Sequence, residues 1–147
     1  MPGAPDMSAE FLRGTDWAAA TQAPLAQDAS ARRYVRLTNS AGQTAILAQD
    51  PSPKSRAAFA ALSAHLRGLG LSAPEVLAID DDAGLMLLED LGDALYTRVI
   101  AADATTENSL YSTAIDTLLT LSGAPPPKLR PLDATTMAEQ AMLAFGW

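Results

Sequence analysis

Short apolar segments separated by turn residues occupy much of the first 90 positions and predict β-strands. Five strands are expected, at residues 17–25, 34–38, 43–48, 75–79 and 85–89. Pro24 would confine the first of them to an edge or an end, because proline cannot donate a hydrogen bond to a strand ladder. Turn-forming residues connect the second strand to the third and the fourth to the fifth. The pattern therefore predicts an antiparallel meander of three strands, followed later by a hairpin of two.

Between the third and fourth strands the apolar spacing changes to three or four residues, which predicts a helix at residues 52–69. Ser52 is positioned to cap this helix, Pro53 to occupy its first position, and Gly70 to end it. The apolar stripe consists of Phe59, Leu62, Leu66 and Leu69. His65 lies at the boundary of the stripe and is interpreted as a half-buried packing residue.

The other helical patterns lie mainly in the second half of the chain. Residues 1–7 are expected to form a loose tail, and Ser8 is expected to cap a short helix to residue 13. Asp93 is expected to cap a helix at 94–101, and Asp133 a last helix at 133–145. A long amphipathic helix between these two has the apolar positions Leu110, Ala114, Ile115, Leu118 and Leu119. Residues 124–127, Ala-Pro-Pro-Pro, predict a stiff extended linker.

The composition narrows the classes of partner. The chain has 147 residues, a formal net charge of -7 and a pI near 4.4, which argues against a general surface for nucleic acid or for an anionic membrane. It contains no cysteine and one histidine, so thiolate and histidine-cluster metal sites are not expected. Three aspartates at 80–82 lack the spacing of a calcium-binding loop and are interpreted as a solvated turn. We expect a cytoplasmic protein that binds a small molecule.

A polar turn at residues 27–31 leads into a group of arginines, Arg32, Arg33 and Arg36. Three of the ten basic residues thus lie within five positions of an otherwise acidic chain. One interpretation is an anion site, because backbone N–H groups of such a turn can form a concave nest and arginine binds phosphate through two parallel hydrogen bonds. The alternative is a hairpin whose exposed edge strand carries solvated charges. This segment alone leaves both possibilities open.

The order of the elements resembles that of a protein-kinase-like small lobe followed by the beginning of a helical large lobe. Three segments carry a more specific resemblance: residues 25–36, residues 66–78, and residues 87–93 with the sequence Leu-Leu-Glu-Asp-Leu-Gly-Asp. Through them the chain resembles the aminoglycoside-phosphotransferase-like kinases, and within these the bacterial anomeric kinases of N-acetylmuramate and N-acetylglucosamine, which serve cell-wall recycling. The resemblance extends from about residue 11 to residue 147. It implies an α+β fold, with a small lobe of five antiparallel strands and one helix at residues 1–90 and the start of the large lobe at 91–147.

The resemblance also implies a nucleotide site that binds ATP. The residues that would contact the phosphates are Gln27, Asp28, Ala29, Ser30, Arg32 and Arg33. The residues that would form the adenine pocket and the hinge are Leu25, Ala45, Leu88, Glu89, Asp90 and Leu91. Magnesium would be expected only in a full-length enzyme, where an amino sugar would be the acceptor.

The sequence departs from the family pattern at three places. Gln27 stands where relatives usually have glycine, so the loop is less free to adopt positive φ. The third strand contains no lysine in either possible register, although such a lysine usually holds the phosphates. The following helix contains no Asp or Glu, so the usual partner of that lysine is absent as well. We expect Arg32 or Arg33, with Lys54 as a more distant candidate, to supply the missing positive charge.

Two functions of different class follow. In the first, the chain is the ATP-binding N-terminal portion of an amino-sugar phosphotransferase and is inactive alone, because the resemblance implies that the catalytic aspartate and the metal ligands come after a long helix, beyond residue 147. In the second, it is a non-catalytic kinase-like module that docks through its C-terminal helices. The apolar residues Met137, Met142, Phe145 and Trp147 would then lie exposed. Self-association through residues 133–147 is the corresponding expectation.

Overall fold

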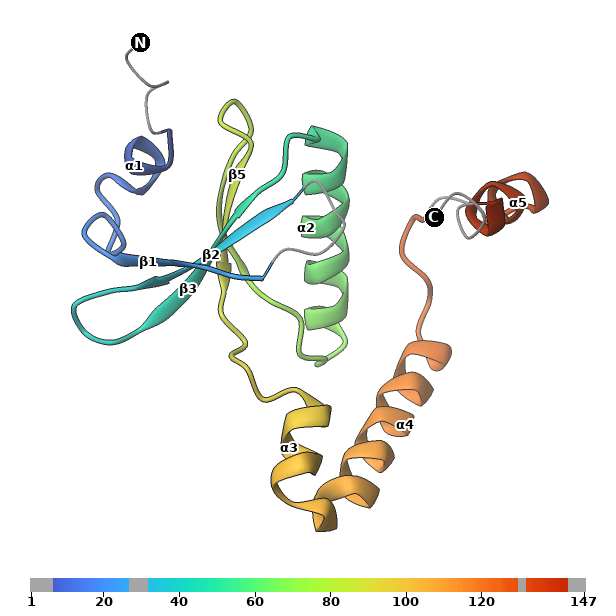
Figure 1. Ribbon diagram of the computed structural model, residues 1–147. Coiled ribbons are helices and arrows are strands. Elements are labelled where there is room, and N and C mark those ends of the chain that lie inside the picture. Colours follow the sequence, from blue (N-terminus) through green and yellow to red (C-terminus); the bar gives the residue numbers. More distant parts are fainter. Residues whose placement is uncertain (1–6, 27–31, 130–131, 143–147) are drawn as a thin grey trace.

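The strands form one antiparallel sheet of five strands in the order β1-β2-β3-β5-β4 (Figure 1). They are β1 (Thr21–Pro24), β2 (Arg33–Thr38), β3 (Thr44–Gln49), β4 (Val76–Asp80) and β5 (Leu85–Glu89). The computed structural model describes residues 7–26, 32–129 and 132–142. The predicted fold class, a mixed α+β lobe with a five-stranded antiparallel sheet, is confirmed.

Helices cover both faces of this sheet. The helix α1 (Met7–Leu12) lies on one face, and α2 (Pro53–Gly68) lies on the other (Figure 1). Under α1 the core consists of Leu12, Leu37, Ala45, Leu47, Leu85 and Leu87. Under α2 it consists of Ala48, Met86 and Leu88, with the partly buried Tyr34, Ile46, Phe59 and Val76 against it. Because both faces are covered, β3 and β5 are apolar at nearly every position instead of alternating with polar residues.

The signals for α2 in the sequence are confirmed. The side chain of Ser52 accepts a hydrogen bond from the Ser55 N–H at 3.2 Å, as an N-cap does, and Pro53 is the first helical residue. The helix ends before Gly70, which has φ +76° and donates to the Arg67 carbonyl at 2.9 Å. Glycine adopts this left-handed conformation without the steric cost of a Cβ atom.

The buried face of α2 differs from the predicted apolar stripe. Leu62 is 40% exposed, whereas Arg56 is 1% exposed and Ser63 is buried. The Ser63 hydroxyl donates to the Pro74 carbonyl at 2.5 Å, which fixes the segment that leads from α2 into β4. The helix therefore packs on the sheet partly through polar side chains that bond to backbone carbonyls, and spacing of apolar residues alone does not locate that face.

Arg56 joins α2 to the ends of three strands. Its guanidinium donates to the Asp50 carbonyl at 2.5 Å, just after β3, and to the Asp81 carbonyl at 2.8 Å, between β4 and β5. It also forms an ion pair with the Asp81 carboxylate at 2.8 Å. The aspartate turn is exposed as predicted, yet Asp81 is a partner of a buried charge in addition to being solvated. Gly84 lies beside this cluster, since a Cβ atom there would be 3.1 Å from the Asp50 carbonyl oxygen.

Several predicted boundaries are wrong at the N-terminal end. The first strand begins at Thr21, because Trp17 to Ala20 form a turn in which the Ala20 N–H donates to the Trp17 carbonyl at 3.1 Å. Trp17 packs against the core under α1 instead of extending the strand. Ser8 lies inside α1, whose first described residue is Met7, and is not its cap. The edge position that Pro24 predicted for β1 is confirmed.

The C-terminal part consists of helices that extend away from the sheet (Figure 1). They are α3 (Tyr96–Ala102), the 3-10 turn η1 (Ala104–Thr106), α4 (Glu107–Gly123) and α5 (Ala134–Met142). The Asp133 carboxylate accepts from the Thr136 N–H at 2.8 Å, so the predicted cap of α5 is confirmed. The predicted cap of α3 is wrong: Leu95 precedes this helix, and Asp93 pairs instead with an arginine of β2.

The long amphipathic pattern of α4 is not matched by burial. Residues 96–102 and 107–123 are all described, and none of them is buried. Ile115 is 57% exposed and Leu118 is 64% exposed. On α5, Met137 and Met142 are exposed, while Phe145 and Trp147 lie outside the described residues. Within the part of the chain that the structure describes, no helix is long and apolar enough to cross a membrane.

We predict that Arg56→Met destabilises the protein by about 2–4 kcal/mol, because two carbonyls and a carboxylate lose a charged donor. Chemical denaturation measures the change. Lys54→Met is the matched control, since Lys54 is exposed on the same helix, and it should change the free energy of unfolding by less than about 0.5 kcal/mol. An equal effect of the two substitutions would contradict the role assigned to Arg56.

Candidate functional site

A cavity of about 350 Å³ opens on the α2 side of the sheet, where β5 runs into the connector that follows it. Its lining is mainly apolar at the sheet and polar at the connector. The lining residues are Leu25, Tyr34, Arg36, Ile46, Phe59, Pro74, Leu88, Glu89, Asp90, Leu91, Gly92 and Asp93. Such a combination of an apolar slot with a few polar groups and accessible backbone is typical of a small-molecule site.

Five of the six residues predicted for the adenine pocket and hinge line this one cavity. They are Leu25, Leu88, Glu89, Asp90 and Leu91, which come from the end of β1, from β5 and from the connector. The sixth, Ala45, does not line the cavity. It is completely buried in the core under α1, on the opposite face of the sheet.

Ile46 takes the place that was assigned to Ala45. In the sheet, Ile46 pairs with Arg36 of β2 and with Leu88 of β5, and all three side chains line the cavity. Side chains of a strand alternate between the faces, so Ala45 and Ile46 cannot both face the cavity. Because Ala45, Ile46, Leu47 and Ala48 are all apolar, their pattern does not indicate which two of them face which helix.

The connector after β5 is fixed to β2 by Arg36. The Arg36 Nε atom lies 2.6 Å from an Asp90 carboxylate oxygen, and its Nη1 atom lies 2.6 Å from an Asp93 carboxylate oxygen. The Asp90 carboxylate, which is nearly buried, also accepts from the Gly92 N–H at 2.9 Å. Arg36 belongs to the arginine group for which an anion site was one interpretation, but it was not among the residues predicted for the phosphates, the adenine pocket or the hinge. Its pairing with Asp90 and Asp93 was not predicted, because these residues are more than 50 positions away in the sequence.

The same contacts shift the ionisation of the groups involved. Hydrogen bonds from Arg36 lower the pKa of Asp93. Burial alone would raise the pKa of Asp90, but hydrogen bonds from Arg36, the Gly92 N–H and Thr44 outweigh it and lower this pKa below 3.8. The pKa of Arg36 is raised, first by Asp93 and then by Asp90. All three groups are therefore charged at neutral pH, and the connector is held to the sheet by ionic bonds.

Arg32 does not line the cavity itself but lies next to the aromatic side chain of Phe59, which does. Its guanidinium carbon is 5.8 Å from the centre of the Phe59 ring, its Nε atom donates to Asp50 at 2.8 Å, and its Nη2 atom donates to Ser55 at 2.6 Å. A hydrogen bond with Tyr34 contributes most to raising the pKa of Arg32. Arg32 is thus a cation held beside the cavity by fixed partners.

Arg33 lies elsewhere. It is the first residue of β2, is exposed, and shares the face of Val35 and Leu37, which is covered by α1. Lys54 is exposed in the first turn of α2. Of the phosphate-binding residues predicted from the sequence, the structure thus places Arg32 beside Phe59 of the cavity lining and places Arg33 on the other face of the sheet. Gln27, Asp28, Ala29 and Ser30 lie outside the described residues.

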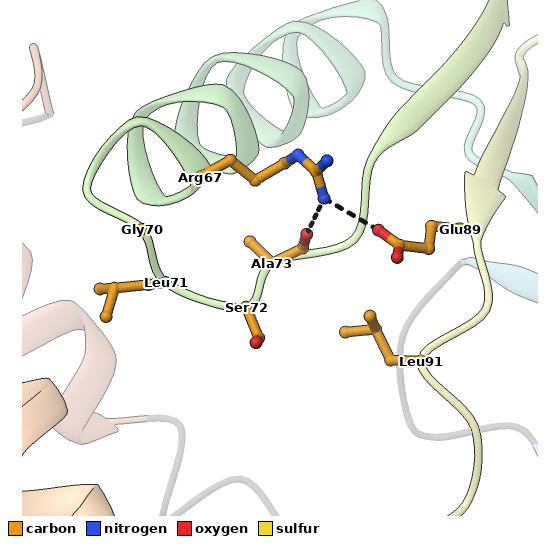
Figure 2. Close-up of a pocket in the computed structure, with 7 residues that line it drawn as sticks. All are labelled: Arg67, Gly70, Leu71, Ser72, Ala73, Glu89 and Leu91. Atoms are coloured by element: carbon orange, nitrogen blue, oxygen red, sulfur yellow. Dashed lines mark hydrogen bonds and ion pairs between the residues drawn. The ribbon is translucent and has the colours of Figure 1, made fainter.

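A second cavity of about 350 Å³ lies behind the connector, between the end of α2 and the segment that leads into β4 (Figure 2). Figure 2 shows Arg67 reaching across it to the Ala73 carbonyl, at 3.1 Å, and to the Glu89 carboxylate, at 2.9 Å. Arg67 also pairs with Glu75 at 2.9 Å. The two cavities share Glu89 and Leu91, so this network holds the end of β5 where the two cavities adjoin.

A five-stranded antiparallel sheet with one helix beside a cavity, whose last strand continues through a connector into helices, is the small lobe of a kinase-like phosphotransferase. The chain belongs to the phosphotransferase enzyme family, whose sequence pattern matches residues 21–144. The predicted family is therefore confirmed.

Curated relatives agree with this assignment. The chain is 39% identical to the N-acetylmuramate/N-acetylglucosamine kinase of Caulobacter vibrioides over 155 aligned positions, which cover 87% of this chain and 42% of that protein. It is 31% identical to the enzyme of the same name from Pseudomonas aeruginosa, over 65% of this chain and 28% of the relative. The chain thus spans less than half the length of these relatives.

The lowered pKa of Asp90 predicts how stability depends on pH. Because this pKa is below 3.8 in the folded state, the contribution of Asp90 is complete above the unfolded value and is lost as the pH falls through the folded value. Asp90→Asn should therefore lower stability at pH 7 and should make the loss of stability between about pH 5 and pH 2 less steep. Thermal melts across this range measure both effects.

Asp82→Asn is the control for that experiment, since Asp82 is exposed in the turn between β4 and β5. Its melting temperature should vary with pH as that of the parent protein does. A profile of Asp90→Asn that is parallel to the parent profile would show that the ion pair with Arg36 does not contribute to stability.

Proposed function

We propose that this chain is the ATP-binding N-terminal portion of an amino-sugar phosphotransferase. The observation that carries the proposal is the cavity, which is lined both by apolar side chains of the sheet and by residues of the connector. Leu25, Ile46 and Leu88 would contact the two faces of adenine, and the backbone of residues 89–91 would bond to its edge. The division at about residue 90 then separates a nucleotide-binding lobe from the first helices of a second lobe.

The polarity of the cavity favours one orientation of the nucleotide. Adenine would lie near the connector, where Glu89, Asp90 and Asp93 concentrate negative charge, and the phosphates would lie away from it. Arg32 lies beside Phe59, a residue of the cavity lining on α2, and would be the cation nearest to these phosphates. Its planar guanidinium suits phosphate oxygens, so Arg32 would supply the charge that a third-strand lysine supplies elsewhere in the family. Residues 27–30 would add backbone contacts to the same phosphates.

The proposed acceptor is an amino sugar, because the most informative relatives are named as kinases of N-acetylmuramate and N-acetylglucosamine. When ATP is bound, its terminal phosphate is the group transferred to a sugar hydroxyl. Within this chain, the cavity would bind and orient the nucleotide, and Arg32 would reduce the negative charge of the phosphates. The base that orients the hydroxyl and the ligands of magnesium would come from the remaining length of the enzyme, as the resemblance implies.

The two arginines make a matched pair for testing nucleotide binding. Arg32→Ala should weaken ATP binding by about tenfold, because one charged contact to phosphate is lost, and should leave adenosine binding almost unchanged. Arg33→Ala should leave the binding of both ligands close to that of the parent, since this side chain lies on the other face of the sheet. Titration calorimetry measures the four affinities. Equal losses of ATP and adenosine in Arg32→Ala would contradict the assignment of Arg32 to the phosphates.

The chain alone should not transfer phosphate. Positioning and neutralisation of charge by metal ions provide most of the catalysis in this reaction, and the groups proposed to provide them belong to the remaining part of the enzyme. An assay with ATP, magnesium and N-acetylmuramic acid should show no turnover above the control without protein. Turnover that is abolished by Arg32→Ala would contradict the proposed division of roles.

A second candidate function is favoured by the exposed apolar residues of α4 and α5. In this alternative, the chain is a kinase-like binding or regulatory module that docks through its C-terminal helices, with a second copy as the simplest occupant. Ile115, Leu118, Met137 and Met142 are each about half exposed or more, and burial of such side chains drives association.

Light scattering over a range of concentrations tests this alternative. A dimer that dissociates when Ile115 and Leu118 are replaced by lysine would support it. A protein that stays monomeric at high micromolar concentration would count against self-association and would leave the phosphotransferase portion as the better account.

A further inference from the structure

The cavity face of the sheet carries successive rows of side chains, and these rows order the site from one end to the other. The row nearest the connector consists of Arg36, Ile46 and Leu88. The next row consists of Tyr34, Ala48 and Met86. Arg33 of β2 pairs with Gln49 of β3 at the end of the ladder. Arg32 and Asp50 are the residues that come next beyond this pair, one before β2 and one after β3. Alternation returns them to the cavity face, one row beyond Ala48.

The middle row contains the position on β3 at which a lysine of the family pattern would reach the cavity. Ala48 is completely buried on the α2 side of β3 and carries only a methyl group, so this strand presents no cation to the cavity there. One row further, Arg32 and Asp50 form an ion pair at 2.8 Å between Nε and Oδ2. A cation and a carboxylate are thus both present, but each comes from a position outside the strands.

Asp50 is itself held from several sides. Its side chain is almost completely buried, and its carboxylate accepts from the Ser52 N–H at 2.9 Å while it also bonds to Arg32. Its carbonyl accepts from the buried Arg56, and its N–H donates to the Gly84 carbonyl at 2.9 Å. Asp50 therefore cannot follow the arginine if the arginine moves. It is a fixed anchor between the end of β3 and the start of α2.

The anchor sets the direction of the Arg32 side chain. The Nε atom bonds to Asp50, the Nη2 atom bonds to Ser55 at 2.6 Å, and the guanidinium lies against the ring of Phe59, which lines the cavity. A guanidinium held through two of its edges by groups on rigid elements loses little further freedom when it binds an anion, and this lowers the entropic cost of binding.

We infer that Asp50, assisted by Ser55, is a positioning residue that aims Arg32 at the phosphates of the nucleotide. This rests on the proposed function, because it assumes that a nucleotide occupies the cavity. The pair Arg32–Asp50 then performs, from the residue before β2 and from the β3–α2 connection, the task that a lysine of the third strand and a glutamate of the following helix perform in the family pattern. Neither residue of that usual pair is present in this sequence.

The experiment compares ATP with adenosine in variants of the full chain. Asp50→Asn should weaken ATP binding by about tenfold and adenosine binding by less than about twofold, since only the phosphates depend on the direction of Arg32. Ser55→Ala removes the second anchor and a hydrogen bond to Asp50, but leaves the charges of Arg32 and Asp50 in place, and should give a smaller selective loss of ATP binding. This milder variant keeps the test valid even if Asp50→Asn folds poorly.

The control for structure is Ser52→Ala, which removes the cap of α2 at the same place but leaves the Arg32–Asp50 pair intact. It should lower the melting temperature without changing the ratio of the ATP and adenosine affinities. A double-mutant cycle completes the test: in the Arg32→Ala background, Asp50→Asn should cause no further selective loss of ATP, because the residue that it positions is gone.

The possible outcomes separate the two claims. A parent chain that binds neither ligand would overturn the proposed function and this inference with it. A parent chain that binds both, with an Asp50→Asn variant that loses them equally or that is additive with Arg32→Ala, would overturn only the positioning role. Tighter binding of ATP by Asp50→Asn would also overturn it, since Asp50 would then compete with the phosphates for Arg32.

Discussion

The pairing register of β2, β3 and β5 decides which side chains meet at the cavity. A shift of one residue would turn Ala45 and Leu47 toward the cavity in place of Ile46 and Ala48. The side chains that now pack under α1 and those that now pack under α2 would change places. Two features outside the ladder oppose such a shift. Arg56 holds the end of β3 and the β4–β5 turn to α2, and Arg36 holds β2 to the connector after β5. The apolar rows and the polar bonds of Arg56 and Arg36 thus specify the same alignment of the strands.

Three arginines near the two cavities are each paired with carboxylates: Arg32 with Asp50, Arg36 with Asp90 and Asp93, and Arg67 with Glu75 and Glu89. Asp50, Asp90 and Glu89 each accept a further hydrogen bond from a backbone N–H. Arg32 is the one proposed to meet the phosphates, whereas Arg36 and Arg67 hold the end of β5 and the connector after it. The ion pairs therefore hold these positive side chains at defined places in a protein whose net charge is -7.

The sequence was sufficient for the order and type of the elements, because turn residues, Ser52, Pro53 and Gly70 act locally. The resemblance placed a hinge at residues 89–91, and in the structure Glu89 ends β5 while Asp90 and Leu91 follow it. The sequence could not separate Ala45 from Ile46, since a sheet covered on both faces is apolar on both. It could not reveal that Asp93 binds Arg36 instead of capping α3, because this contact spans 57 positions. Arg32 and Arg33 are adjacent and chemically identical, and only the register assigns them to different faces.

The most direct test of the central claim is to follow the backbone amides of the isotope-labelled chain by NMR while ATP is added. We predict that the largest chemical-shift changes occur at Leu25, Ile46 and residues 88–91. Further changes are expected at Arg32 and Ser55 that adenosine does not produce. Shifts concentrated at Arg67 to Ala73, around the second cavity, would contradict this prediction, as would a spectrum that ATP leaves unchanged.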